Sequence, residues 1–200
     1  MKRIILVCLS IISILSASAQ VWVGGTLGGS QRKVKLNEGG TSTLSGFHLS
    51  PTVGYDLNPH LTLALSVNYS HLNYKSSETY SSGQSQIQEL GVSPYLRYYF
   101  AECSGVRFFW RGGVNYAKTW THHKASLDGQ TTFDQRHDGH RFGFDLCPGI
   151  SYLFNDRVNL LATLGGIGWE QTWSSDDAPT SSHFFANFSD KFSIGFQIYL

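Results

Sequence analysis

The feature that most constrains this chain is an alternation of large apolar residues with other residues, at every second position, in eight separate stretches. A period of two places one set of side chains on one face of a β-strand, whereas a helix requires a period near 3.6. Three stretches share a nine-residue phrase, in which a Pro is followed four residues later by a Tyr: "SPTVGYDLN", "SPYLRYYFA" and "CPGISYLFN". A fourth, "SIGFQIYL", keeps the rhythm without the Pro. The pattern predicts an all-β fold with eight strands.

The connections between these stretches alternate between short and long. The short ones read "NPH", "AECSG" and "NDR", and the long ones, rich in Ser, Thr, Gly, Asp and His, cover 28–44, 75–85, 124–139 and 172–183. Strands joined by such short turns are antiparallel neighbours, and strict alternation places all the short turns at one rim. We therefore expect an eight-stranded antiparallel up-and-down barrel with long loops at the opposite rim.

The charged residues are sorted by face. In the six best-defined strands the alternating apolar positions carry no Lys, Arg, Asp or Glu, and the opposite positions carry Asp56, Glu89, Arg97, Arg107, Arg111, Arg141, Asp145 and Lys191. A charge facing lipid costs about 2–4 kcal/mol at the middle of a bilayer. The sorting therefore predicts a transmembrane barrel whose lumen holds these eight residues as a charged network. Arg97, Arg107 and Arg111 are expected to pair with Glu89, Asp145 or Asp56, because an unpaired buried charge is costly.

The repeated tyrosines distinguish a membrane barrel from a secreted soluble one. Tyr55, Tyr98 and Tyr152 lie at the same height, near the short-turn rim. Such a ring is typical of an interfacial aromatic belt, with the apolar ring in lipid and the hydroxyl at the headgroups. A soluble barrel would instead have to place the large apolar residues inside, where eight strands leave little room. The lumen of the membrane barrel is expected to be filled by glycines alternating with large side chains.

The N-terminus has the features of a secretory signal peptide over residues 1–19. Lys2 and Arg3 precede an apolar stretch, 4–15, which is followed by Ala17-Ser18-Ala19 as a cleavage site. The apolar stretch is too short for a membrane-spanning helix, which needs about 20 residues. Residues 20–200 are then expected to form a single domain. The net charge of +1 does not favour nucleic acid as a partner.

The two remaining cysteines are not expected to pair. Cys103 falls in a short turn, and Cys147 lies about seven residues along a strand from another turn. That offset is about 20 Å at about 3.3 Å per residue. A disulfide needs Cα atoms within about 7 Å of each other.

The phrase "SPTVGYDLN" with the following "LTLALSVNYS", the count of eight strands and the final "KFSIGFQIYL" resemble the small outer-membrane β-barrel proteins of Gram-negative bacteria. This group comprises the porin-family and OmpX- or OmpW-like barrel domains. The resemblance implies export, insertion by the barrel-assembly machinery and a position among outer-membrane lipids. Its motifs specify the scaffold and no activity.

Two chemical hypotheses arise from the histidines. His122, His123, His137 and His140 lie on opposite arms of the third long connection, and imidazoles are ligands for zinc or copper. Solvated loop histidines are the simpler interpretation, and we expect neither a metal nor a cofactor. His71 with Ser45 on the preceding strand would suggest an outer-leaflet lipid enzyme, but no outward-facing acid is placed to orient the histidine.

We therefore expect a monomeric, non-enzymatic outer-membrane scaffold. It would present four extracellular loops to an unidentified ligand, or support envelope integrity, since loops on a rigid scaffold usually carry function. The main alternative is a small porin-like pore for small solutes. An outer-leaflet lipid-modifying enzyme is a minor alternative.

Overall fold

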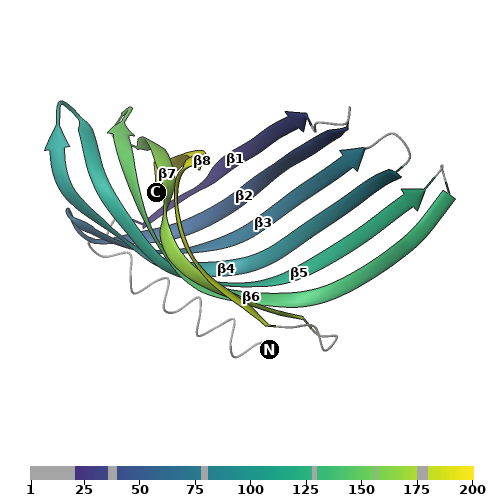
Figure 1. Cartoon of the computed structure of the whole chain (residues 1–200). Coiled ribbons are helices and arrows are strands. Elements are labelled where there is room, and N and C mark those ends of the chain that lie inside the picture. The colour runs from purple at the N-terminus through teal and green to yellow at the C-terminus, as the bar shows by residue number, and fades with distance from the viewer. Residues whose placement is uncertain (1–20, 36–39, 78–80, 128–129, 156, 175–179) are drawn as a thin grey trace.

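A computed structural model of the chain describes residues 21–35, 40–77, 81–127, 130–155, 157–174 and 180–200 (Figure 1). The predicted signal peptide, residues 1–19, lies outside these residues. Within them, no helix has the length and apolar character needed to cross a membrane.

The described residues form eight strands that close into a barrel in sequence order. Every neighbouring pair is antiparallel, including the first strand with the last. The predicted eight-stranded up-and-down barrel is confirmed. The strands are β1 (Val21–Lys35), β2 (Thr41–Asn58), β3 (Leu61–Ser77), β4 (Ser81–Cys103), β5 (Val106–Leu127), β6 (Gln130–Leu153), β7 (Val158–Ser174) and β8 (Ser181–Tyr199).

The connections predicted as long loops are instead largely strand. The β4–β5 ladder runs up to Ser81 opposite Leu127, and the β5–β6 ladder runs up to Leu127 opposite Gln130. These segments are polar on both faces, so they lack the period of two, yet their backbones continue the hydrogen-bonded hairpins. Strands of up to 24 residues result, where about 9–11 residues suffice to span a bilayer. The excess forms a wall at one end of the barrel, which we call the long-hairpin end.

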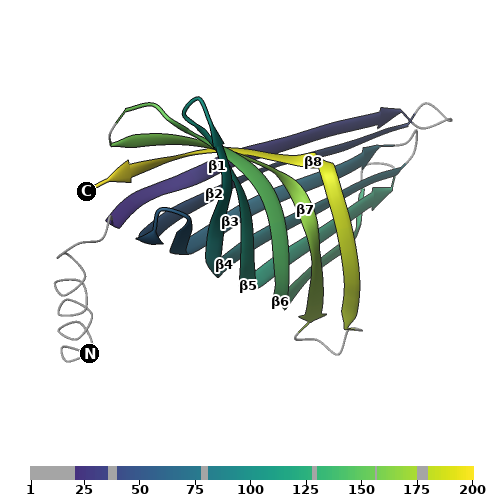
Figure 2. The ribbon, with the colours of Figure 1, turned by 90° about the vertical axis from the view of Figure 1, so that its left-hand side faces the viewer.

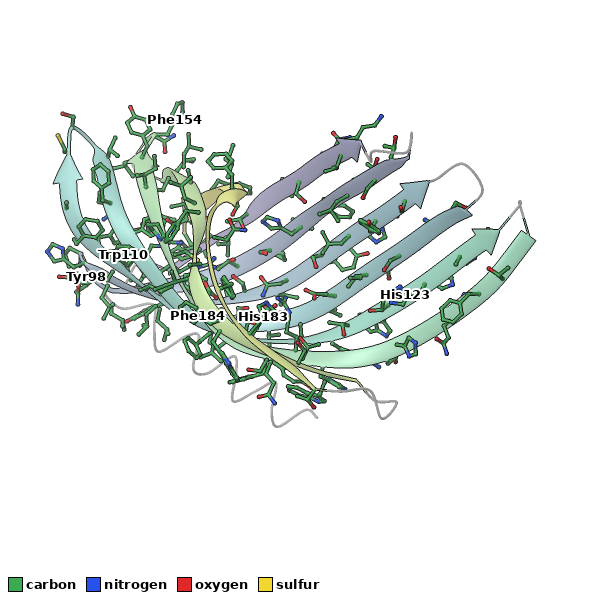
Figure 3. All side chains as sticks on the ribbon, in the orientation of Figure 1. Tyr98, Trp110, His123, Phe154, His183 and Phe184 are labelled. Atoms are coloured by element: carbon green, nitrogen blue, oxygen red, sulfur yellow. The ribbon has the colours of Figure 1, made fainter. Side chains whose placement is uncertain are left out.

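The two faces of the sheet differ in the way that the sequence pattern predicts. On β3, Leu63, Leu65 and Val67 are each 45–48% exposed on the outside, whereas Thr62, Ala64 and Ser66, at the alternate positions, are buried inside. Tyr98 and Trp110 belong to the same outer face (Figure 3). Apolar side chains outside and polar ones inside are the arrangement of a barrel whose solvent is lipid.

The three prolines of the repeated phrase coincide with gaps in the ladders. Pairing between β2 and β3 skips Pro51, pairing between β4 and β5 skips Pro94, and pairing between β6 and β7 skips Pro148 with a shift of register. Proline has no N–H to donate to a neighbouring strand. The missing N–H accounts for each gap, and the ladder resumes at the next residue.

The seam between β1 and β8 is the shortest join of the barrel. Only seven residue pairs connect these strands, from Trp22 opposite Tyr199 to Gly28 opposite Ser193. Beyond Gly28, β1 continues to Lys35 while paired with β2 alone. From this point toward the long-hairpin end, β7 and β8 diverge from β1 (Figure 2).

Glycines allow this bend. The β7–β8 register shifts between Leu164 and Gly166, at the pair Gly165–Gly166. A Cβ atom on Gly165 would overlap the carbonyl oxygen of Asn187, so the strands approach here more closely than any other residue permits. The bulge also exchanges the two faces of β7. Before Gly165 the even-numbered residues face outward, and after Gly166 the odd-numbered residues do.

Candidate functional site

The lumen near the short-turn end is filled by a cluster that we call the Arg97 layer: Trp22, Tyr95, Arg97, Tyr99 and Phe109. Arg97 is only 3% exposed, and Trp22 and Phe109 are 1% exposed. The guanidinium carbon of Arg97 lies 4.9 Å from the ring centroid of Phe109 and 5.4 Å from that of Trp22. Aromatic faces at this distance attract a cation, and more strongly when water is excluded.

Hydrogen bonds complete the surroundings of Arg97. Its Nη1 donates to the hydroxyl of Tyr99 at 3.0 Å and to Oε1 of Gln197 at 2.8 Å. Its Nη2 donates to the hydroxyl of Tyr95 at 3.2 Å. Residues of β4 and β8 are thereby joined across the lumen, although they are distant in the sequence.

Small residues make room for the large ones of this layer. A Cβ on Gly54 would overlap the Trp22 ring, and one on Gly149 would overlap the Phe109 ring. Beside Arg97 lies a cavity of about 10 Å³, which is about the space that one water molecule needs. Large buried side chains therefore fill the lumen at this height.

The structure pairs the predicted lumen charges only in part. Arg111 Nη2 lies 3.0 Å from Asp145 Oδ2, whereas Arg97 has no carboxylate within 4.0 Å among the described residues. The Arg107 guanidinium lies 3.9 Å from the ring centroid of Tyr99. Asp56 accepts hydrogen bonds from neutral side chains instead: Trp22 Nε1 at 3.2 Å, Thr62 Oγ1 at 2.6 Å and the Tyr199 hydroxyl at 3.1 Å.

A second charged group lies in the lumen closer to the long-hairpin end. Arg141 bridges Glu89 at 2.6 Å and Glu170 at 2.9 Å, and Glu170 lies 3.1 Å from Nε2 of His183. Glu170 was missed at the sequence level because the bulge at Gly165 reverses the inward phase of β7. The side chain of Lys191 lies outside the described residues.

The three tyrosines of the predicted belt lie near the short-turn end. Tyr98 and Tyr152 are 53% and 47% exposed on the outer face, and Tyr55 is half-buried beside Val21. In their hairpins, Tyr55 is opposite Leu63, Tyr98 opposite Trp110 and Tyr152 opposite Leu160. Their role at a membrane interface stays a prediction.

The outer face of the β5–β6 hairpin carries paired charges. His122 Nε2 lies 2.6 Å from Asp134 Oδ1, Lys124 Nζ lies 3.5 Å from Asp134 Oδ2, and Lys118 Nζ lies 3.2 Å from Asp138 Oδ2. The hydrogen bond to His122, together with the charge of Lys124, holds the pKa of the Asp134 carboxyl below its ordinary value. This carboxylate therefore stays ionised to lower pH than a free one.

An aromatic stack crosses the same outer face. The rings of Tyr116 and His140 have centroids 5.9 Å apart, as do those of His140 and Trp173, both at an interplanar angle of 22°. The Tyr116 hydroxyl is 2.8 Å from His140 Nδ1. The stack ties β5, β6 and β7 together beyond the apolar band.

The four histidines of this hairpin do not converge. Strand alternation places His122 and His140 on one face and His123 and His137 on the other. The His123 and His137 rings have centroids 6.4 Å apart. No group of three metal-ligating side chains occurs among the described residues.

The hypothetical Ser45–His71 pair is also not assembled. His71 is opposite Phe47, with ring centroids 6.0 Å apart, whereas Ser45 is opposite Asn73. On β2 the residue across from His71 is thus an apolar ring, and on β4 it is Gln88. Both described cysteines are free: Cys103 is exposed, and Cys147 in the lumen donates to Asp145 at 3.0 Å.

Comparisons with known proteins agree with this architecture. The family model described as "Outer membrane protein beta-barrel domain" matches residues 4–196. A major outer membrane protein from Thermus thermophilus is similar in structure, with a TM-score of 0.51 and 15% identity over 92% of this chain and 100% of that one. OprG from Pseudomonas aeruginosa gives 0.44 and 16% over 92% and 96%, and Neisserial surface protein A gives 0.40 and 16% over 92% and 99%. No curated protein sequence matches significantly.

Proposed function

Because the chain belongs to the outer membrane protein β-barrel domain family, we propose that it is a non-conducting outer-membrane scaffold with its long hairpins outside the cell. The observation that carries this proposal is the Arg97 layer. An ion crossing the barrel would have to displace Trp22, Phe109 and a hydrogen-bonded Arg97, which leave a cavity of only about 10 Å³ beside them.

The long hairpins are the part of the scaffold that can meet a partner. In the β5–β6 hairpin, β6 has 24 residues, which is about 13–15 more than the 9–11 or so that span a bilayer. Its outer face presents Lys118, His122 and Lys124 with their paired aspartates, on a backbone fixed by strand pairing. A rigid polar surface of this kind supports recognition of a partner outside the cell.

Conductance tests the closed lumen. The mature chain, refolded in detergent and checked by its heat-dependent gel mobility, is inserted into a planar bilayer. We expect no discrete current steps. Reproducible steps from folded protein would overturn the proposal and favour the porin-like alternative.

Two variants make a silent result meaningful. The double variant Trp22→Ala/Phe109→Ala removes two rings from the lumen and is expected to conduct, which shows that the assay detects this barrel when it is open. Phe108→Ala removes a ring from the outer face and is expected to stay silent.

A further inference from the structure

Arg97 carries a positive charge that no acid balances among the described residues. It is 3% exposed, its Nη atoms bind two phenols and one amide, and its Nε has no hydrogen-bond partner there. Neutral hydroxyls and aromatic faces stabilise a buried cation less than a counter-ion does. A buried N–H without a partner in a native structure calls for an explanation, such as a bound water or ion.

The cavity beside Arg97 has the character of an anion site. Its polar lining residues are Trp22, Arg97, Arg111, Tyr95, Thr26, Thr52, Ser66 and Thr163, and none of its lining residues is acidic. The Thr52 hydroxyl donates to the carbonyl of Ser50 and lies 2.6 Å from the Ser66 hydroxyl, so the donors that remain for a ligand come chiefly from the two arginines and Tyr95. The Tyr95 hydroxyl accepts a hydrogen bond from Arg97, so its own proton is available to a ligand. Both arginines also have an Nε without a partner among the described residues.

The size and charge limit the ligand. A cavity of about 10 Å³ holds about one water-sized sphere. Arg111 is balanced by Asp145, 3.0 Å away, so the local excess is the single charge of Arg97. We propose that this cavity binds one small monovalent anion, with chloride as the physiological type, and that the anion completes the plug of the lumen.

Water is the competing occupant of the cavity, and it differs from an anion in its effect on the Arg97 charge. A water molecule would satisfy donors but would leave the Arg97 charge uncompensated, whereas an anion does both. The site goes beyond the proposed scaffold function, since the barrel could be non-conducting with either occupant.

The first test is direct localisation. Crystals of the wild-type barrel grown in bromide should show an anomalous peak in the cavity, beside the guanidinium groups of Arg97 and Arg111. The absence of a peak there, in crystals that show bromide at other positions, would overturn the proposal and assign the cavity to water.

The second test measures stability. The urea midpoint of unfolding of wild-type protein in an uncharged detergent should rise with chloride at fixed ionic strength, with gluconate as the replacement, and should then saturate, as expected for a ligand of the folded state. Identical curves in the two salts would contradict the site.

Two arginine variants serve as a matched pair. Arg97→Gln should abolish the chloride dependence, because it removes the uncompensated charge. Arg107→Gln should retain it, because Arg107 lies over Tyr99 and does not line the cavity. Retention of the chloride dependence in Arg97→Gln would indicate a general salt effect and would overturn the site. If Arg97→Gln fails to fold, the bromide result on the wild type decides.

Discussion

At the scale of single residues, the neighbours Phe108 and Phe109 occupy opposite environments. Phe108 is 39% exposed on the outer face, and Phe109 is 1% exposed in the lumen against Arg97 and Gly149. Phe109→Ala should lower the free energy of unfolding by about 3–5 kcal/mol, because it leaves a cavity that the stiff barrel cannot close. Phe108→Ala should cost clearly less, because lipid tails fill the space. Reversible urea unfolding in lipid vesicles measures both, and equal losses would contradict the closed, well-packed lumen.

The surroundings of Arg97 could be predicted from the sequence only in part. The inward position of Arg97 followed from the period of two, because Leu96 and Tyr98 beside it had to face lipid. Its partners did not follow, since Gln197 and Trp22 reach it from strands that the sequence order alone does not place at the same height. The shear of the barrel sets that height, and it depends on bulges such as those at Asp56 and Tyr99.

At the scale of elements, the seam between β1 and β8 divides β1 into two parts. From Trp22 to Gly28 the strand is paired on both sides, and from Gly29 to Lys35 it is paired only with β2. Amides of the upper part that point toward β8 should exchange with solvent deuterium much faster than those of the lower part, whereas alternate amides bonded to β2 stay protected. Hydrogen exchange followed by NMR in micelles checks this, with β2, paired on both sides, as the internal control. Uniform protection along β1 would contradict the open seam.

The elements beyond the apolar band could not be predicted as strands. Gln84, Gln86 and Gln88 stand at every second position of β4 and are separated by Ser85 and Ile87, so neither face of this segment is consistently apolar. Without one buried face no period of two is selected, and only the hydrogen bonds of the hairpin hold the strand. The strand cores, by contrast, were predictable because lipid admits no charge on their outer face.

At the scale of the whole molecule, the orientation in the membrane can be tested through its free thiols. Cys103 is exposed at the end of β4, next to the turn that leads to β5, at the short-turn end. In a Cys147→Ser background, a bulky membrane-impermeant maleimide should leave Cys103 unlabelled on intact cells and label it once the outer membrane is permeabilised. Lys124→Cys, made in a chain that also carries Cys103→Ser, should label on intact cells. The reverse pattern would place the short turns outside.

The short seam has a consequence for how such a protein can change. A closed ring of strands links strand number, tilt and circumference, so a change in one strand must be matched by the others. Above Gly28 and Ser193 the wall is no longer a ring, and that link does not apply there. Hairpins at this end can gain or lose residues in pairs while the membrane-spanning part keeps its register. Seven residue pairs between β1 and β8 close the barrel, and beyond them the lengths of the hairpins can vary.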